Sequence, residues 1–283
     1  MNPSSETIET LDWRGNEGTV IGAARQARTE SAPIVLSVEG ISVAYGKRVV
    51  LSDVACCFPE GEITAIMGPS GCGKSTLLRV LNRTLELIPQ ARLLSGNVAF
   101  RNRELYGRGA DPAAIRKRIG LIHQQPVPFP MSILGNALFG ARYHGLLKGA
   151  SPAEYAQRYL EQVGLWNEVK DRLRDRAERL SGGQQQRLCL ARTLANQPEV
   201  ILMDEPCSSL DPAATQQIEE LILGFKPRYT IIIVTHNLAQ ARRVSDRVIF
   251  MLDGEIIERG STEKIFTSPH FNLTRDFISG RIG

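Results

Sequence analysis

The stretch Gly68-Pro69-Ser70-Gly71-Cys72-Gly73-Lys74-Ser75-Thr76 decides the fold of this chain. It fits the pattern G-x-x-x-x-G-K-[ST], in which glycines let the backbone N–H groups turn inward around a phosphate. An apolar run, Ile63–Met67, leads into it, and a helix-forming run, Leu77–Leu81, leads out. This order places the loop at a helix N-terminus, where anions bind. We therefore predict a nucleotide site in which Lys74 contacts the β- and γ-phosphates and the Ser75 hydroxyl binds Mg²⁺.

The composition is that of a globular protein with one large domain or two small ones. Its 283 residues are 42% hydrophobic and 23% charged, and the net charge of +4 permits an anionic partner without requiring one. No apolar run approaches the ~18 residues that span a bilayer. Glu6, Glu9 and Asp12 exclude a secretory signal at the N-terminus. The 5 cysteines have no metal-ligand spacing, which indicates reduced cytosolic thiols.

Residues 1–33 are polar and aperiodic, and we predict a flexible N-terminal leader there. A short docking motif around Trp13 is the alternative interpretation. From residue 34 the pattern changes to alternating apolar residues, with strands expected at 35–39 and 41–45, broken by Gly40. Further strands at 49–51 and 54–58 complete an antiparallel β unit that leads into the phosphate-loop strand. Tyr45 ends this pattern before a turn, where its ring either stacks on adenine or is an ordinary strand aromatic.

The middle of the chain is expected to be mostly helical. The helix after the phosphate loop is predicted to run to about Leu87, and the basic triplet at 116–118 indicates a solvated helix face rather than nucleic acid contact. Residues 126–130 contain three prolines, which forbid a helix and favour an extended surface segment. That segment fits either a partner-docking site or a rigid linker. Helical spacing then continues from Ile133 to about Arg179.

Two motifs in the second half of the chain carry charge chemistry. Ser181, followed by Gly182 and Gly183, opens a helix and offers a second anion-binding geometry. A buried parallel-type strand at 200–203 then ends in Asp204 and Glu205, where α/β sheets bind ligands. We predict that Asp204 holds Mg²⁺ through water and that Glu205 polarises the attacking water as general base.

His236 follows another apolar strand, at 230–235, and so projects over the same crevice. It is placed either to contact a γ-phosphate and sense its loss, or to serve a structural role. Residues 248–258 then predict a hairpin through Asp253-Gly254, and residues 261–281 predict short C-terminal helices.

Taken in order, these motifs resemble those of the ATP-binding-cassette ATPases. The motifs are the phosphate loop, Gln124, LSGGQ at 180–184, Asp204-Glu205, Ser209-Leu210-Asp211 and His236. The resemblance covers residues 34 to 283. It implies an α/β fold of the P-loop NTPase type, with a RecA-like core, an antiparallel β subdomain and an α-helical subdomain inserted at about 127–187.

Longer runs narrow the resemblance to the ATP-binding subunit of the bacterial phosphate importer. These runs are TLLRVLNR, QQPVPFPMSI, LWNEVKDRL, LSGGQQQRLCLAR, DEPCSSLDP and the ending FISGRIG. Three features depart from that pattern. The leader is longer, His123 stands where an aromatic residue is common, and Ser209 replaces a usual alanine. None of them removes a catalytic group.

The resemblance implies a role for each matching residue. Tyr45 stacks on adenine, the phosphate loop at 68–76 binds the phosphates, and Gln124 contacts Mg²⁺ and the attacking water. Glu205, His236 and Gln124 form the catalytic set, and Ser75, Gln124 and Asp204 form the metal set. Ser181, Gly182 and Gly183 bind the γ-phosphate of an ATP held by another copy. Gln184 belongs to the same cofactor-binding set, and Asp211 links the two sites.

The two anion-binding motifs are expected on separate subdomains of one chain, so they cannot face the same nucleotide. Two copies arranged head to tail make two complete sites, which predicts a homodimer with C₂ symmetry, ATP and Mg²⁺ between the copies. The resemblance implies two integral membrane permease subunits near the segment at 126–133, and indirectly a phosphate-binding protein. It places the chain peripherally on the cytoplasmic face of the cell inner membrane, without nucleic acid.

Three other functions compete with phosphate import. The first is an importer of another substrate, such as phosphonate, molybdate or an amino acid. The second is a non-transport cassette ATPase of DNA repair or translation. The cassette ATPases of DNA repair carry a long coiled coil between the phosphate loop and the LSGGQ motif. Those of translation carry two cassettes in one chain. The third, a non-catalytic nucleotide-binding regulator, conflicts with the presence of Glu205 and His236.

Overall fold

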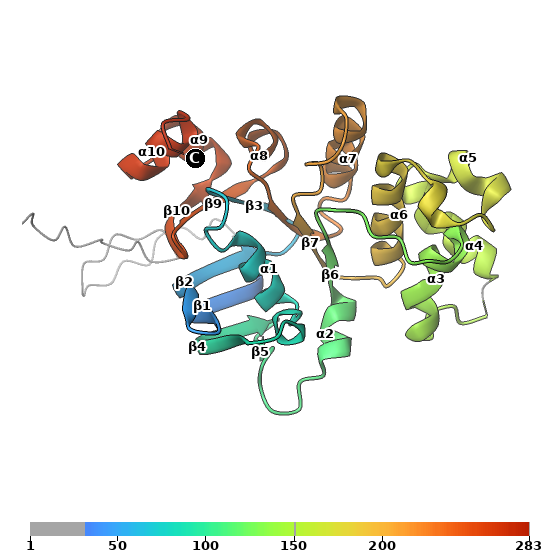
Figure 1. The fold of residues 1–283 in the computed structure, drawn as a ribbon, viewed down its shortest axis with the longest axis horizontal. Coiled ribbons are helices and arrows are strands. Elements are labelled where there is room, and N and C mark those ends of the chain that lie inside the picture. The colour runs from blue at the N-terminus through green and yellow to red at the C-terminus, as the bar shows by residue number, and fades with distance from the viewer. Residues whose placement is uncertain (1–31, 150, 283) are drawn as a thin grey trace, which may run out of the picture.

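The computed structural model describes residues 32–149 and 151–282, which form two sheets separated by a helix and flanked by helices (Figure 1). The predicted leader therefore lies almost wholly outside the described residues. In the described part of the chain no helix is both long and apolar enough to cross a bilayer.

The first sheet has four strands in the order β2-β1-β4-β5. Its strands are β1 (Ile34–Tyr45), β2 (Arg48–Pro59), β4 (Ala91–Phe100) and β5 (Arg103–Glu104), all paired antiparallel. The predicted break at Gly40 is wrong, because β1 continues through it as a bulge at which the register to both neighbours shifts. Gly40 adopts φ 58°, which lets the strand bend without ending. The predicted gap after Leu51 is likewise absent.

The second sheet has six strands in the order β10-β9-β3-β8-β7-β6. Its parallel strands are β3 (Ile63–Met67), β6 (Ile119–Ile122), β7 (Val200–Asp204), β8 (Thr230–Val234) and β9 (Arg247–Leu252). The last strand, β10 (Glu255–Ser261), pairs antiparallel with β9 as the predicted hairpin. The carboxyl ends of β3, β6, β7 and β8 consequently meet at one edge of the sheet, where the predicted site residues follow them.

Helix α1 (Lys74–Leu81) lies between the two sheets. Its buried leucines contribute to a core shared with Leu36 of the first sheet and Leu202 of the second. The prediction that this helix runs to about Leu87 is wrong. It ends at Leu81 because Arg83 adopts φ 60°, and only a 3₁₀ turn, η1 (Leu85–Leu87), follows.

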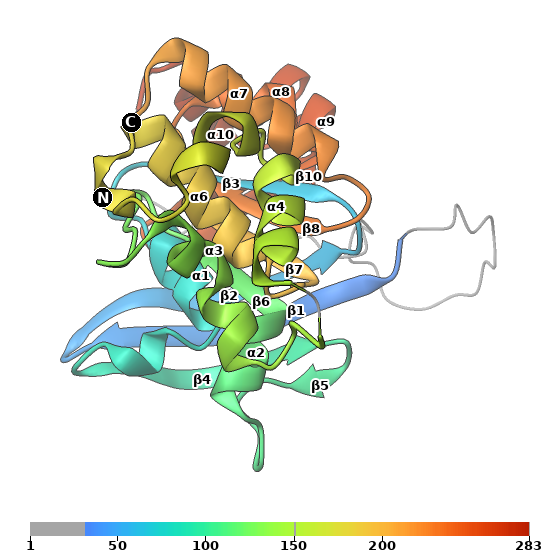
Figure 2. The ribbon, with the colours of Figure 1, turned by 90° about the vertical axis from the view of Figure 1, so that its right-hand side faces the viewer.

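The other face of the parallel sheet carries most of the remaining helices. A second core joins Ile63, Ala65 and Met67 to the helices α3 (Ile133–Tyr143), α4 (Pro152–Gln162) and α6 (Gly182–Leu194). Figure 2 shows these three helices packed side by side, and Figure 1 places them at one end of the molecule, away from β1 and β2. Shorter segments in this region are α5 (Trp166–Val169), η2 (Lys170–Arg172) and η3 (Ala177–Arg179).

Five further helices complete the fold. Before β6 comes α2 (Pro112–Arg118), and the others are α7 (Pro212–Gly224), α8 (Leu238–Val244), α9 (Thr262–Thr267) and α10 (Asn272–Ile278). The last two are the short C-terminal helices that the sequence predicts. Phe277 of α10 stacks on Phe250 of β9, with ring centroids 4.8 Å apart, so the C-terminus is anchored to the sheet.

Candidate functional site

The phosphate loop connects β3 to α1, and its glycines are required by close backbone approach. Gly68 adopts φ 150°, and a Cβ there would lie 2.1 Å from the Met251 carbonyl oxygen. Gly73 is the N-cap of α1 at φ 103°, where a Cβ would lie 2.5 Å from Leu51 Cδ2. Side chains at these positions would displace the loop from β9 and β2.

Lys74 places a buried ammonium group inside this loop. Lys74 is 6% exposed, and its Nζ donates hydrogen bonds to the carbonyl oxygens of Gly68 at 2.7 Å and Pro69 at 2.8 Å. Among residues 32–149 and 151–282 no carboxylate pairs with it. A buried charge without a counterion is costly, so this lysine fits a polyphosphate at the helix N-terminus.

Ser75 and Asp204 bring the predicted metal ligands together. The Ser75 hydroxyl donates to Asp204 Oδ1 at 2.8 Å, although the two residues are 129 positions apart in the chain. Burial raises the pKa of Asp204, an effect that the Ser75 hydrogen bond and Arg79 oppose. The described part of the chain has no group of three or more His, Cys, Asp or Glu that could hold a metal alone. The pair therefore suits Mg²⁺, which takes few protein ligands and completes its shell with water and phosphate oxygens.

The three predicted catalytic residues meet at Glu205. Its Oε2 lies 3.0 Å from His236 Nδ1 and accepts a longer hydrogen bond, 3.4 Å, from Gln124 Nε2. Gln124 follows β6, Glu205 follows β7 and His236 follows β8. Because these three strands are neighbours in the sheet, the three residues lie at adjacent strand ends. Glu205 adopts φ 47°, and its N–H donates to the Val234 carbonyl, which holds this strained backbone in place. The carboxylate keeps 19% exposure and can therefore reach a water.

Tyr45 lies beside the same loop. Its hydroxyl is 3.3 Å from Thr76 Oγ1, and the ring is half-buried against the core between the two sheets. The contact sets the ring against the first turn of α1. Stacking on adenine stays a prediction for this residue.

The signature motif opens α6 through a capping box. Ser181 accepts a hydrogen bond from the Gln184 N–H at 3.4 Å, and Gln184 Oε1 accepts one from the Ser181 N–H at 3.0 Å. Gln184 Nε2 also donates to Glu168, and Arg187 pairs with Glu168 at 2.7 Å. Opposed by burial, these bonds lower the pKa of Glu168. Sequence reasoning assigned no site role to Glu168 or Arg187, and their separation of 19 residues gives no local signal.

This motif lines a depression of about 350 Å³. Its lining comes from α5, the start of α6 and the start of α7: Glu168, Ser181, Gly182, Gly183, Gln184, Arg187, Ser209, Leu210, Asp211, Ala213, Ala214 and Gln217. Asp211 caps α7, accepting a hydrogen bond from the Ala214 N–H at 2.9 Å. No residue of the phosphate loop lines the depression, and Figure 1 shows α1 and α6 in separate parts of the fold. The two anion-binding geometries are thus separate surfaces of the chain.

Asp204→Asn is expected to stabilise the protein while weakening the predicted Mg²⁺ site. The raised pKa means that the folded state favours the protonated carboxyl of Asp204 over the ionised one. The stability that this protonated carboxyl contributes is therefore lost as the pH rises through the pKa of the folded state. Asparagine keeps an oxygen for Ser75 without the buried charge. At neutral pH we expect a gain of about 0.5–2 kcal/mol, or roughly 2–4 °C in Tm per kcal/mol. Scanning calorimetry of the nucleotide-free protein measures it.

The same measurement at about pH 4, where the wild-type carboxyl approaches its protonated form, should show a smaller gain. Asp171→Asn, at an exposed position of η2, is the matched control and should change Tm little. A lower Tm for Asp204→Asn at neutral pH would contradict the cost assigned to this charge.

Comparison with known proteins identifies the family and the fold. The profile of the ABC transporter family matches residues 51–208, more than half of the chain. One similar solved structure is that of a bacterial Atm1-family ABC exporter with ATP bound, at 23% sequence identity and a TM-score of 0.73. The match covers 92% of this chain and 44% of the exporter chain, and at this identity it shows the fold alone. By its fold and by the family match, the chain is a member of the ABC transporter family and carries that family's ATPase domain, which implies ATP binding, usually with Mg²⁺.

Proposed function

We propose that this chain is the ATP-hydrolysing subunit of an importer of inorganic phosphate. It acts as a homodimer, bound to two integral permease subunits on the cytoplasmic face of the cell inner membrane, and a phosphate-binding protein delivers the substrate to the permease. Membership of the ABC transporter family supports ATP hydrolysis and work with membrane subunits. The phosphate assignment rests on the longer sequence runs described above. The likeness to an exporter concerns the fold and leaves the direction of transport open.

The observation that carries the proposal is the meeting of Gln124 and His236 on Glu205, next to the Ser75–Asp204 pair. The loop and Lys74 bind the phosphates, and Glu205 accepts a proton from the attacking water while His236 holds its carboxylate. Mg²⁺, held by Ser75, Asp204 and Gln124, would neutralise charge on the β- and γ-phosphates. The phosphate-binding, metal-binding and general-base residues are thus on one side of the active site.

The other side of the active site must come from a second copy. The depression at Ser181–Gln184 presents a helix N-terminus, and within residues 32–149 and 151–282 the phosphate loop does not reach it. Placing it over the γ-phosphate of a neighbouring copy completes both sites in a C₂ dimer. ATP then holds the dimer closed, and hydrolysis removes the bridging γ-phosphate and lets it open.

We assign the coupling surface to the segment around residues 126–133. Phe129 packs on Phe139 with ring centroids 4.6 Å apart, and Arg192 lies 4.1 Å from the Phe129 centroid. Val127 and Tyr143 leave apolar area exposed beside them, at 58% and 75%. An exposed apolar surface of this kind suits a permease segment. It falls in the proposed helical subdomain, about 127–187, of an ATPase domain at 34–283 that follows the leader at 1–33.

The test is ATP hydrolysis by this chain reconstituted in vesicles with the two permease subunits of a bacterial phosphate importer. Phosphate-loaded binding protein should stimulate the rate. Binding proteins loaded with phosphonate, molybdate or an amino acid should not. Stimulation by one of these instead would reassign the substrate, and hydrolysis that never responds to a permease would favour a non-transport ATPase.

A further inference from the structure

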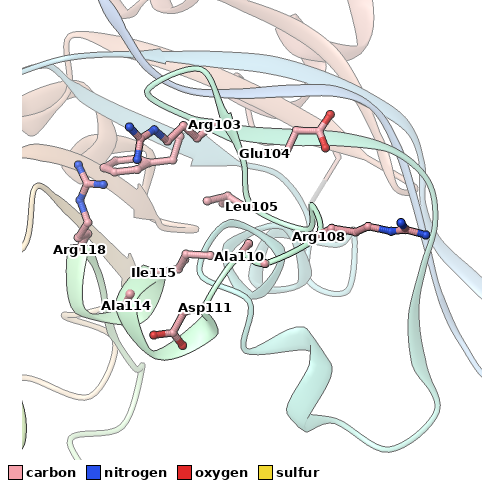
Figure 3. A pocket seen from close by; sticks show the side chains of 11 residues that line it. Arg103, Glu104, Leu105, Arg108, Ala110, Asp111, Ala114, Ile115 and Arg118 are labelled. Carbon is pink, nitrogen blue, oxygen red and sulfur yellow. The ribbon is translucent and has the colours of Figure 1, made fainter.

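A second hollow, of about 330 Å³, lies outside the nucleotide site, between the β4–β5 hairpin and α2 (Figure 3). Its floor is apolar and comes from Phe100, Leu105, Ala110, Ala114 and Ile115. In Figure 3, Leu105, Ala110 and Ile115 lie between Arg103 and Arg118 on one side and Arg108 on the other. An apolar floor with cationic groups at the rim suits an amphipathic, acidic ligand.

The rim of this hollow carries two arginines without carboxylate partners. Arg103 and Arg108 are exposed, and neither forms an ion pair within residues 32–149 and 151–282. Arg118 is different, because it pairs with Glu199 at 2.5 Å and stacks 4.4 Å from the Phe100 centroid. Of the two acids in the lining, Asp111 caps α2, and Glu104 remains on the rim. The charges available to a ligand are therefore chiefly the two guanidinium groups.

The wall opposite β5 is held in a fixed shape. Arg83 Nη1 donates to the carbonyl oxygens of Leu105 and Ala110, both at 2.9 Å, and its guanidinium pairs with Glu86 at 2.6 Å. Its guanidinium carbon also lies 5.2 Å from the Tyr106 ring centroid. The loop between β5 and α2 is thus tied to the end of α1, so the hollow is largely preformed.

The chain enters the described structure beside this hollow. The Val35 carbonyl accepts a hydrogen bond from the Arg101 N–H at 2.9 Å, and Leu36 is the cross-strand partner of Phe100 in the floor. The Pro33 carbonyl accepts one from the Glu60 N–H at 2.7 Å. The described chain therefore begins one strand away from Phe100, next to the hollow, although none of its first residues lines the hollow.

The sequence of residues 1–31 matches the chemistry of the hollow. Within Ser4–Trp13, Glu6, Glu9 and Asp12 are acidic, no lysine or arginine occurs, and Ile8, Leu11 and Trp13 are apolar. We propose that this segment of the chain docks into the hollow, with Trp13 on the apolar floor and the carboxylates on Arg103 and Arg108. Indole is the best aromatic partner for a guanidinium, so Arg103 gains a cation–π contact as well.

Because the segment around Trp13 is covalently attached to the folded domain, even a weak site would be occupied. Pro33 lies 20 positions after Trp13, and a coil of that length spans roughly 25 Å on average. A short tether gives an effective concentration of about 1 mM, so a site with an isolated Kd of about 0.1 mM would be occupied about ten to one. The leader is then an intramolecular ligand on α2, the helix that leads through β6 to Gln124.

The test uses the full chain with Trp166→Phe, which leaves Trp13 as its only tryptophan. Acrylamide should quench Trp13 fluorescence about fivefold less than it quenches N-acetyltryptophanamide, because the docked indole is shielded. Arg103→Glu with Arg108→Glu should raise quenching to the free value, and so should Glu9→Lys with Asp12→Lys in the leader. The leader variants leave the folded domain unaltered, so they exclude misfolding as the cause.

Reversing both sides, Arg103→Glu and Arg108→Glu with Glu6→Lys, Glu9→Lys and Asp12→Lys, should restore the protection. Arg142→Glu with Arg158→Glu, exposed arginines of α3 and α4, is the matched control and should leave Trp13 shielded. The proposal would be overturned if acrylamide quenched Trp13 in the Trp166→Phe chain as strongly as it quenches N-acetyltryptophanamide. It would also be overturned if Trp13 stayed protected after Arg103→Glu and Arg108→Glu. Protection that vanishes on dilution would also overturn it, because a second copy would then be the source of the leader.

Discussion

Glu205→Gln is expected to abolish steady-state ATP hydrolysis while leaving ATP binding intact. Glutamine is nearly isosteric and can still reach His236 Nδ1, which lies 3.0 Å from Glu205 Oε2. It cannot take a proton from the attacking water, and a positioned general base contributes about 10²–10⁴-fold in rate. Single-turnover and steady-state phosphate release should both fall by that factor. Binding of a fluorescent ATP analogue to the variant should match that of the wild type.

The same variant should accumulate as a dimer in the presence of ATP, since the bridging γ-phosphate is never removed. Sedimentation velocity with ATP, ADP or no nucleotide distinguishes these states. Glu263→Gln, on the exposed surface of α9, is the matched control and should hydrolyse ATP normally. If Glu205→Gln turned over ATP near the wild-type rate, another group would be the base.

The sequence predicted the α/β fold and the strand–loop–helix geometry of the site because local rules determine both. Gly68 and Gly73 are required because a Cβ there would lie 2.1 Å from the Met251 carbonyl oxygen and 2.5 Å from Leu51 Cδ2, and the pattern of glycines encodes this directly. Asp204, Glu205 and His236 follow buried apolar strands, and parallel strands bring their carboxyl ends to one edge. The approach of His236 to Glu205 was therefore predicted from the strand ends, whereas Gln124 was assigned only through the family resemblance.

Features that depend on distant segments were not predictable in this way. The end of α1 at Leu81 is set by the positive φ of Arg83, whose guanidinium is bound by carbonyls at Leu105 and Ala110, more than twenty positions later. The Glu168–Arg187 pair behind the signature motif joins α5 to α6 without any periodic signal. That same arginine holds one wall of the hollow beside β5. In each case tertiary contacts override the local propensity.

Gly182→Asp is expected to prevent ATP-driven dimerisation without harming the isolated chain. A Cβ at this position would meet only Leu210 Cδ2, at 4.0 Å, and an acid in the first turn of α6 favours the helix dipole. Within one copy the change is therefore tolerated. In the proposed dimer the new carboxylate would face the γ-phosphate of the neighbouring copy, and like charges placed together cost several kcal/mol. Association and hydrolysis should each fall by about 10²-fold or more.

The measurement compares Glu205→Gln chains with and without Gly182→Asp by sedimentation in ATP. The control Gly224→Asp, exposed at the end of α7 with no atom near its Cβ position, should still dimerise. ATP binding by the isolated Gly182→Asp chain should be unchanged. Weakened binding there would mean that Gly182 faces the nucleotide of its own chain, and the split site would be wrong.

A mixture gives the sharpest form of this prediction. Lys74→Ala removes the ammonium group from the phosphate-loop half of the site, and Gly182→Asp places a carboxylate in the half formed by Ser181–Gln184. Neither variant should therefore dimerise alone with ATP. A heterodimer of the two, both carrying Glu205→Gln, contains one site with an intact Lys74 from one copy and an intact Gly182 from the other. ATP should therefore produce heterodimers at raised protein concentration. That result is possible only if each active site takes its two halves from different chains, as the separation of α1 from the depression at α6 requires.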